Sequence, residues 1–171
     1  GPLMKNYQVS SVYIGGGTPS SIDEQWITAL MEGVFDCFNV LPDAEISIEC
    51  NPGTLSREKL LAYRDAGINR LSIGLQSANN DELKLLGRIH TFEQFVTNYE
   101  VARNVGFKNI NVDLMYGLPG QSASQYMATV NKIIRLHPDH ISAYSLIVEK
   151  GTPFYEKYKF DMVRQEAGMG T

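Results

Sequence analysis

The sequence has only two cysteines among its 171 residues, Cys37 and Cys50. Two thiols are too few for a disulfide framework, and they lack the spacing of metal ligands. The sequence also lacks an apolar run long enough to span a bilayer, and it shows no signal-peptide pattern. We therefore expect an intracellular, cytoplasmic chain with no membrane span and no metal site built from its own residues.

Basic residues are not in excess either. Fifteen Lys and Arg stand against 19 Asp and Glu, for a formal net charge of -4. This balance argues against a nucleic-acid partner. No Ser/His/Asp or Cys/His arrangement stands out, and the three histidines lack metal-ligand spacing. The sequence accordingly predicts no catalytic residue.

The composition is ordinary for one globular domain, with 43% hydrophobic and 20% charged residues. Gly1-Pro2 is typical of a protease-cleavage scar, so we interpret residues 1–8 as a tag or extension. Residues 9–160 form the predicted domain. The polar tail, residues 161–171, is expected to be frayed.

Five short runs alternate polar and apolar residues, the pattern of strands with two different faces. The apolar positions are Val12, Ile14, Ile46, Ile48, Leu71, Ile73, Leu75, Ile110, Val112, Leu114, Ile141 and Ala143. The alternate positions are Ser11, Tyr13, Glu45, Ser47, Glu49, Ser72, Gly74, Gln76, Asn111, Asp113, Met115, Ser142 and Tyr144. One face of each strand therefore packs on an apolar layer, and the other is wet or bound to a ligand.

The segments between these strands have helical periodicity, which favours parallel strands in an α/β fold. The strands are predicted to begin near Val9, Glu45, Arg70, Asn109 and His140. A parallel sheet normally has both faces buried. A polar inner face therefore predicts an open β/α barrel around a polar ligand, with about five strands present.

Three helix starts are predicted from capping-box spacings, in which a side chain satisfies a free backbone N–H. The pairs are Ser21 with Glu24, Thr91 with Gln94, and Ser122 with Gln125. Gly67 and Gly106 mark helix ends. Two apolar stripes are expected to pack on the sheet: Trp26, Leu30, Val34 and Phe38, and Phe92, Phe95, Tyr99 and Ala102.

The glycine-rich segment Gly15–Ser20 follows the first strand, where β/α folds bind ligands. Glycines let the backbone approach a ligand closely, and the helix expected to open after them favours an anion. A tight βα turn is the plain alternative. A phosphate site in this loop is a second reading of the same residues.

Polar side chains also lie at or near the ends of later strands: Glu49, Gln76 and Asp113, with Arg88 following a short helix. Each has a plain alternative. Glu49 and Arg88 could be surface residues, and Asp113 could form an internal ion pair with Arg88 or Arg70. Together they suit a small zwitterionic or hydroxyl-rich ligand, such as an amino acid joined to a nucleoside.

Ordered blocks of motif residues cover nearly the whole chain: Tyr13–Ser20, Glu45–Glu49, Arg70–Ser77, Leu86–His90, Asn111–Gln121 and His140–Leu146. These blocks resemble the radical S-adenosylmethionine superfamily, and specifically the oxygen-independent coproporphyrinogen III oxidase group. Gln76-Ser77 and the run Leu146–Thr152 are more similar to its haem-chaperone branch than to the true oxidase.

The resemblance implies an incomplete open (β/α)6 barrel, a partial TIM-type fold, that binds S-adenosylmethionine. Gly16, Gly17 and Thr18 would lie at the amino end of its methionine part. Four residues would contact its polar groups: Glu49, Gln76, Arg88 and Asp113. Ile147 would meet the adenine. The partner implied for the parent protein is a tetrapyrrole, either coproporphyrinogen or haem.

One family motif is not found in these residues: the Cys-x3-Cys-x2-Cys loop that holds a [4Fe–4S] cluster. We expect the cluster in the full-length parent only, and a fragment that is inactive and colourless after reconstitution with iron and sulfide. Three functions stay open. They are a coproporphyrinogen oxidase-like enzyme, a haem chaperone without oxidase activity, and a barrel that binds a phosphorylated small molecule.

Two structural expectations follow from the strand pattern. Glu49 and Asp113 should face the barrel lumen, with Ile48 and Val112 facing the helices, because a one-residue slip would reverse every side chain. The first strand should also leave an unpaired edge beside apolar surface. Such an edge predicts an edge-mediated dimer, unless residues 1–8 fold back over it.

Overall fold

The computed structural model describes residues 7–148, 150–151 and 154–158. The predicted frayed tail, residues 161–171, lies outside these residues. Of the predicted extension, only Tyr7 and Gln8 are described, and Gln8 already belongs to the first strand. Among the described residues, no helix is long and apolar enough to cross a membrane.

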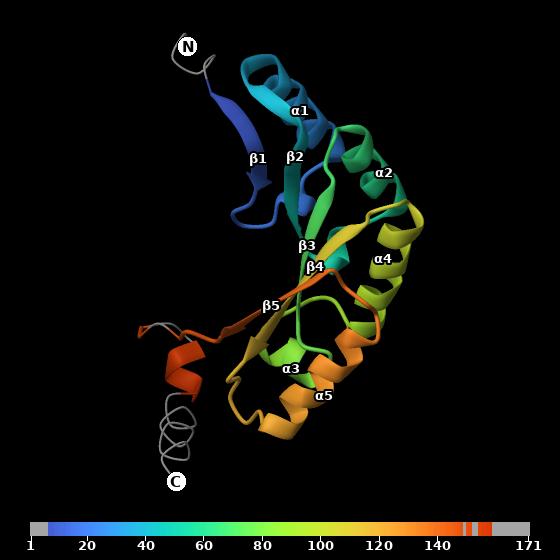
Figure 1. Cartoon of the computed structure of the whole chain (residues 1–171). Helices are drawn as coiled ribbons and strands as arrows, with labels where there is room; N and C mark the ends of the chain where they lie inside the picture. The colour runs from blue at the N-terminus through green and yellow to red at the C-terminus, as the bar shows by residue number, and fades with distance from the viewer. Residues whose placement is uncertain (1–6, 149, 152–153, 159–171) are drawn as a thin grey trace.

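Five parallel strands form one sheet in chain order. They are β1 (Gln8–Ile14), β2 (Asn39–Cys50), β3 (Arg70–Gln76), β4 (Asn109–Tyr116) and β5 (His140–Ser145). The sheet curls into a half-barrel, which confirms the predicted incomplete barrel (Figure 1). Since β1 and β5 end the strand order, each leaves one edge without a partner strand in this sheet.

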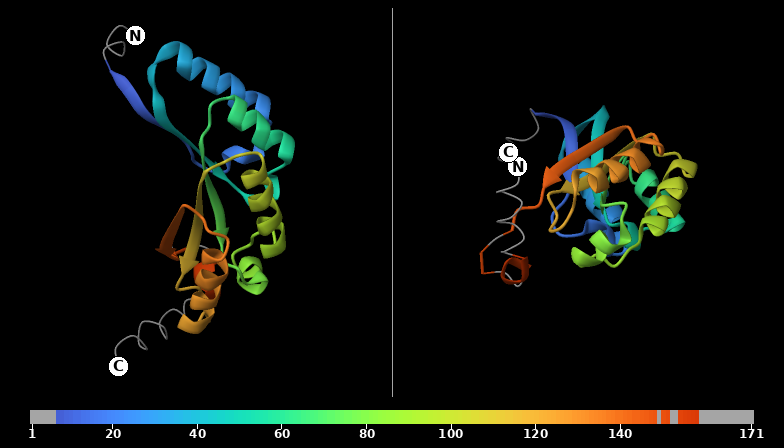
Figure 2. Two further views of the ribbon diagram at one scale, coloured as in Figure 1. Left: turned by 45° about the vertical axis from the view of Figure 1, so that its right-hand side comes forward. Right: turned by 90° about the horizontal axis from the view of Figure 1, so that it is seen from below.

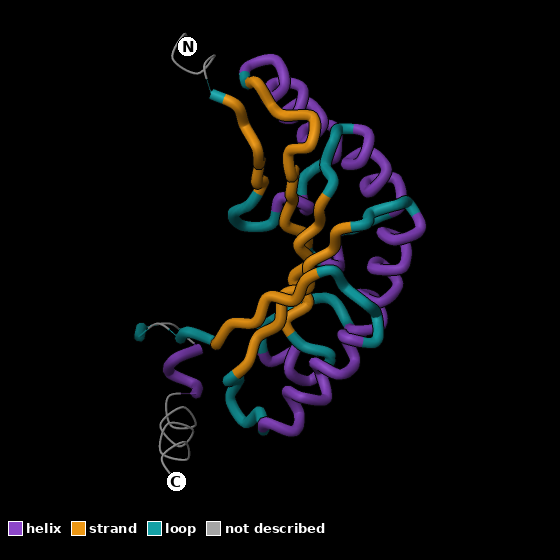
Figure 3. The backbone as a smooth tube through the Cα atoms, in the orientation of Figure 1, coloured by secondary structure: helices purple, strands orange, loops and turns teal. Residues whose placement is uncertain are grey.

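Helices link the strands and lie along the convex side of the sheet, while the concave side is open (Figures 2 and 3). They are α1 (Glu24–Cys37), α2 (Arg57–Asp65), α3 (Asn80–Leu85), α4 (Phe92–Asn104) and α5 (Ala123–Ile134). Two short 3-10 helices, Pro19–Ser21 and Pro52–Thr54, follow β1 and β2. The concave side is therefore where a ligand can reach the strands.

The two faces of the central strands differ as the alternation predicts. Residues facing the helices are almost fully buried: Ile48, Leu71, Ile73, Leu75, Ile110, Val112 and Leu114 are each 0% exposed. Glu49 and Asp113 line a pocket on the other face. The predicted orientation is thus confirmed: Ile48 and Val112 face the helices, and Glu49 and Asp113 face the lumen.

The predicted starts of β3, β4 and β5 match the structure, but β2 begins at Asn39, six residues before Glu45. The pairing explains the error. Val9 pairs with Val40, and Ser11 already pairs with Glu45, so residues 41–44 bulge out of register. Pro42 lies in that bulge and has no N–H to donate, and Asp43 is a poor strand residue.

The capping boxes at Thr91 and Ser122 are present as predicted, at the starts of α4 and α5. The one predicted at Ser21 is wrong. Its hydroxyl donates to the Thr18 carbonyl at 2.7 Å, and Asp23 caps α1 by accepting from the Gln25 N–H at 3.0 Å. Gly67 and Gly106 end helices with φ of +88° and +100°, a region that favours glycine.

Of the stripe predicted on α4, Phe95, Tyr99 and Ala102 are buried, and Phe92 is partly buried against the core. The stripe predicted to pack α1 on the sheet is wrong for Trp26 and Leu30, which are 64% and 48% exposed, and for Phe38, which is 36% exposed, whereas Val34 packs against the core. Ile27 and Met31 are buried instead. The inward face is thus offset by one residue, about 100° of helix rotation. The sequence does not distinguish the exposed stripe from the buried one, because both carry apolar residues at helical spacing.

Candidate ligand-binding site

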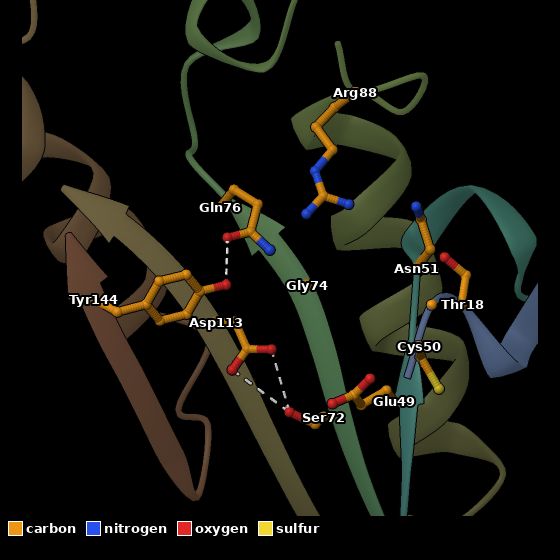
Figure 4. A pocket seen from close by; sticks show the side chains of 11 residues that line it. Thr18, Glu49, Cys50, Asn51, Ser72, Gly74, Gln76, Arg88, Asp113 and Tyr144 are labelled. Atoms are coloured by element: carbon orange, nitrogen blue, oxygen red, sulfur yellow. Dashed lines mark hydrogen bonds between the residues drawn. The ribbon is translucent and has the colours of Figure 1, made fainter. Parts of the chain in front are cut away.

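A polar pocket lies on the concave face at the carboxyl ends of the strands, with a cavity volume of about 200 Å³ (Figure 4). Every strand except β1 contributes a residue to its wall, and the loop after β1 closes one side. The lining residues are Gly17, Thr18, Glu49, Cys50, Asn51, Ser72, Gly74, Gln76, Arg88, Asp113 and Tyr144.

Glu49 joins β2 to the glycine loop. Its Oε1 accepts a hydrogen bond from the Tyr13 hydroxyl at 2.8 Å, and its Oε2 accepts from the Gly16 N–H at 3.1 Å. Partial burial and this bond to a carboxylate raise the pKa of Tyr13 to about 12. Tyr13 therefore stays a hydrogen-bond donor at neutral pH, and the pair holds the Glu49 carboxylate in place.

Glycine is needed in the loop for two different reasons. A Cβ on Gly15 would lie 2.6 Å from Tyr13 Cε1 and 3.0 Å from Glu49 Oε1, so a side chain there would push the pair apart. Gly16 and Gly17 have φ of +92° and +64°, where other residues are strained. The three glycines thus bring the backbone onto the Glu49 carboxylate.

The loop does not open directly into a long helix, contrary to the sequence-based expectation. Pro19–Ser21 forms a 3-10 turn, and the Gln25 N–H in the first turn of α1 donates to the carboxylate of Asp23. An acidic cap disfavours an anion at that helix end. The phosphate reading of the loop therefore finds no support in the geometry of α1.

A buried hydroxyl and a lysine fix the far end of this loop. Lys59 Nζ donates to the carbonyls of Ser20 and Ile22 at 2.8 and 2.9 Å. The Ser20 hydroxyl lies 2.6 Å from Thr54 Oγ1 and accepts from the Asn51 N–H at 2.9 Å. The loops after β1 and β2 are thus held together beside the pocket.

Asp113 is bound to neutral donors rather than to a cation. Its Oδ1 accepts from Asn111 Nδ2 at 2.7 Å, and its Oδ2 accepts from the Ser72 hydroxyl at 3.3 Å. No ion pair with Arg70 or Arg88 is found among the described residues, so that alternative is wrong. Burial, the largest effect, raises the pKa of Asp113 above its usual value of 3.8.

Gln76 and Arg88 place N–H groups across the pocket from the two carboxylates. The Tyr144 hydroxyl donates to Gln76 Oε1 at 2.8 Å, which leaves the Gln76 Nε2 group to donate into the pocket. Gly74 makes room for it, since a Cβ there would lie 3.0 Å from Gln76 Nε2. Figure 4 shows the Arg88 guanidinium beside the Gln76 amide, apart from Glu49 and Asp113.

The pocket brings together Gly17, Thr18, Glu49, Gln76, Arg88 and Asp113 of the predicted site residues. Gly16 lies just outside and donates to Glu49. Ile147 is 83% exposed and does not line the pocket, so its role as an adenine contact stays a prediction.

Five residues at the site are not predicted from the sequence: Tyr13, Cys50, Asn51, Ser72 and Tyr144. Tyr13, Ser72 and Tyr144 occupy the alternate polar positions of their strands. That alternation was the signal that could have identified them. Cys50 and Asn51 follow Glu49 at the strand end and carry no comparable signal.

No group of three or more His, Cys, Asp or Glu side chains that could hold a metal ion occurs among the described residues. Cys37 is exposed on α1, and Cys50 is buried, which raises the pKa of its thiol. A [4Fe–4S] cluster needs a set of thiolate ligands. The residues of this chain therefore do not fit the cluster.

Comparison with known families shows a match to the radical SAM superfamily over residues 3–133. Curated relatives include the "Heme chaperone HemW" of Bacillus subtilis, 42% identical over 86% of this chain, and that of Escherichia coli, 40% identical over 86%. A bovine relative, "Radical S-adenosyl methionine domain-containing protein 1, mitochondrial", is 38% identical over 86%. The predicted resemblance to this superfamily and to its haem-chaperone branch is confirmed.

Among solved structures, the coproporphyrinogen III oxidase HemN of Escherichia coli, a radical SAM enzyme, aligns with a TM-score of 0.80. It is 30% identical, and the alignment covers 98% of this chain and 41% of that one. The chain likewise spans 39% of the length of the two bacterial relatives. It therefore corresponds to about two fifths of such proteins.

Proposed function

Because the chain belongs to the radical S-adenosylmethionine superfamily, we propose that its pocket binds S-adenosylmethionine. The observation that carries this proposal is the division of the pocket into two halves. Gln76 Nε2 and the Arg88 guanidinium offer only hydrogen-bond donors, whereas Glu49 and Asp113 offer only acceptors when ionised. A ligand with both a carboxylate and groups that donate satisfies both halves.

S-Adenosylmethionine has these groups. Its carboxylate would accept from Arg88 and Gln76, as a guanidinium favours carboxylates. Its ammonium group and ribose hydroxyls would donate to Glu49, Asp113 and the carbonyls of the glycine loop. We further propose that Ile147, exposed beyond β5, meets the adenine ring.

Where a [4Fe–4S] cluster is present, it would supply the electron for the reductive cleavage of bound S-adenosylmethionine. This chain's own residues bind and orient it, and they lack the thiolates for the cluster. We propose that the cluster, and any enzymatic activity, belong to a longer protein of which this chain is one part.

Isothermal titration with S-adenosylmethionine, carried into the millimolar range, tests the binding proposal. We expect one site, and Arg88→Gln should weaken binding by about tenfold or more because a charge-assisted hydrogen bond is lost. Arg135→Gln is the matched control, since Arg135 is exposed at the end of α5 and lies away from the pocket. No binding, or tighter binding of a sugar phosphate, would overturn the proposal.

For the longer protein we propose haem transfer rather than coproporphyrinogen oxidation. The support is the names of the curated relatives, which are haem chaperones at up to 42% identity, against 30% for the oxidase. Haem titration followed by absorbance separates the two functions. A chaperone should bind haem and yield it to an apo-acceptor, whereas an oxidase should instead convert coproporphyrinogen. A cytoplasmic location remains a prediction, since the bovine relative is named mitochondrial.

A further inference from the structure

Gln76 presents its side chain to the pocket from a strained backbone. It has φ of +75°, in the left-handed region that residues other than glycine rarely adopt. The register between β3 and β4 also shifts there, since Gly74 pairs with Asp113 and Gln76 with Leu114. Strain of this kind persists only where the surrounding structure enforces it.

The next residue, Ser77, is fully buried and hydrogen-bonded on both sides. Its hydroxyl donates to Glu82 Oε2 through a short hydrogen bond and accepts from the Asn79 N–H at 3.0 Å. Glu82 Oε2 also accepts from Gln121 Nε2 at 3.1 Å. One carboxylate oxygen on α3 thus links the chain after β3 to the loop after β4.

Burying the Glu82 carboxylate costs folding free energy. Glu82 is only 8% exposed, and its Oε1 is buried without a hydrogen-bond partner among the described residues. No cation pairs with Glu82 in the part of the chain that the structure describes. A buried, half-satisfied carboxylate destabilises a fold. Glu82 is bonded to Ser77, which directly follows the strained residue Gln76, and this position points to a role in holding that segment.

We propose that Glu82 is a positioning residue that, through Ser77, holds Gln76 in its left-handed conformation and so aims the Gln76 amide into the pocket. Glu82 itself is not among the residues that line the pocket. The hydrogen bond from Tyr144 fixes which end of the Gln76 amide faces the ligand, and Glu82 fixes the position of that amide. The expected effect of Glu82 on ligand affinity rests on the proposed binding of S-adenosylmethionine. The expected effect of Glu82 on the Gln76 backbone does not.

The first test needs no ligand. The φ angle of Gln76 is measured by NMR scalar couplings in the chain and in Glu82→Ala, Glu82→Gln and Asp81→Asn. We expect Glu82→Ala to release Gln76 from positive φ, and Glu82→Gln to retain it because an oxygen acceptor remains. Asp81→Asn is the control, with a side chain 89% exposed on the same helix. If Glu82→Ala fails to fold, Ser77→Ala removes the same link with a smaller change.

The second test is a double-mutant cycle on S-adenosylmethionine affinity. Glu82→Ala should weaken binding by about tenfold alone and have no further effect in a Gln76→Ala background. A Gln76 φ that is unchanged in Glu82→Ala and Ser77→Ala would overturn the inference. So would equal losses of affinity in both backgrounds. If the parent chain binds no S-adenosylmethionine, the proposed function fails, and the φ measurement still decides the role of Glu82.

Discussion

The two faces of this sheet are built from alternate residues of the same strands, but one face packs against the helices and the other lines the pocket. On β3, Leu71 and Ile73 are 0% exposed against the helices. Ser72, which lies between these two residues, and Gln76, which follows them, are also buried. They are 5% and 3% exposed, but they face the pocket. The helix face is filled by aliphatic packing, and the lumen face by hydrogen bonds among hydroxyls, amides and carboxylates.

The difference shows how stability and binding can be separated within a single strand. Packing on the helix face is stabilising in proportion to the apolar area removed from water. Polar groups on the lumen face contribute little net stability, because each exchanges bonds with water for bonds within the protein. Substitutions on the helix face should therefore lower stability, whereas substitutions on the lumen face should lower ligand affinity.

The largest expected effect is on the helix face. Ile73→Ala should lower the free energy of unfolding by about 3–4 kcal/mol, because it leaves a cavity in the fully buried core. Arg88→Gln, in the loop that closes the pocket on the lumen side, should change it by less than about 1 kcal/mol while weakening ligand binding about tenfold or more. Urea unfolding of both variants, followed by circular dichroism, checks the contrast. Equal losses of stability would break the separation of the two faces.

A smaller effect is expected in the glycine loop. Gly15→Ala should displace Tyr13 or Glu49, since the new Cβ would stand 2.6 Å from the Tyr13 ring. We expect about tenfold weaker S-adenosylmethionine binding, the equivalent of one good hydrogen bond. Gly33→Ala is the control. Nothing lies within 4 Å of a Cβ there, and the helix should gain about 0.5–1 kcal/mol. Unchanged affinity in Gly15→Ala would show that the Tyr13–Glu49 pair does not position the ligand.

Asp113 should leave a signature in the pH dependence of stability. Because burial raises its pKa in the folded chain, the folded state holds its proton to higher pH than the unfolded state. Stability from this group is therefore full below the usual pKa of 3.8 and falls as pH rises through the raised value. Asp113→Asn removes that fall. The stability of the parent minus that of the variant, from urea titrations, should thus decline with rising pH from about 4 upwards. A difference that grows instead would mean that the carboxylate is stabilised in its charged form.

The smallest effect is expected at Trp26. Since its side chain is 64% exposed on α1, Trp26→Ala should change the free energy of unfolding by less than about 0.5 kcal/mol. Met31→Ala, on the buried side of the same helix, should cost about 2–3 kcal/mol. Thermal unfolding of the pair compares them. A large loss from Trp26→Ala would mean that the exposed stripe of α1 is covered in solution.

Period-two alternation let the sequence predict the lumen and helix faces, because side-chain direction on a strand depends on position alone. It could not predict the start of β2, where Pro42 lies in a bulge. It also could not choose between two apolar stripes on α1, since both have helical spacing. The Tyr13–Glu49 and Tyr144–Gln76 bonds join residues 36 and 68 positions apart. Such partners depend on how strands curl together, which local pattern does not encode.

The central claim is that the lumen face binds S-adenosylmethionine with its carboxylate toward Gln76 and Arg88. A crystal structure of the chain with S-adenosylmethionine tests it most directly. The account predicts the ligand in the pocket between Thr18 and Tyr144, its carboxylate on the Arg88 guanidinium and its donors on Glu49 and Asp113. A ligand bound elsewhere, or one in this pocket with its carboxylate toward Glu49 and Asp113, would contradict the account.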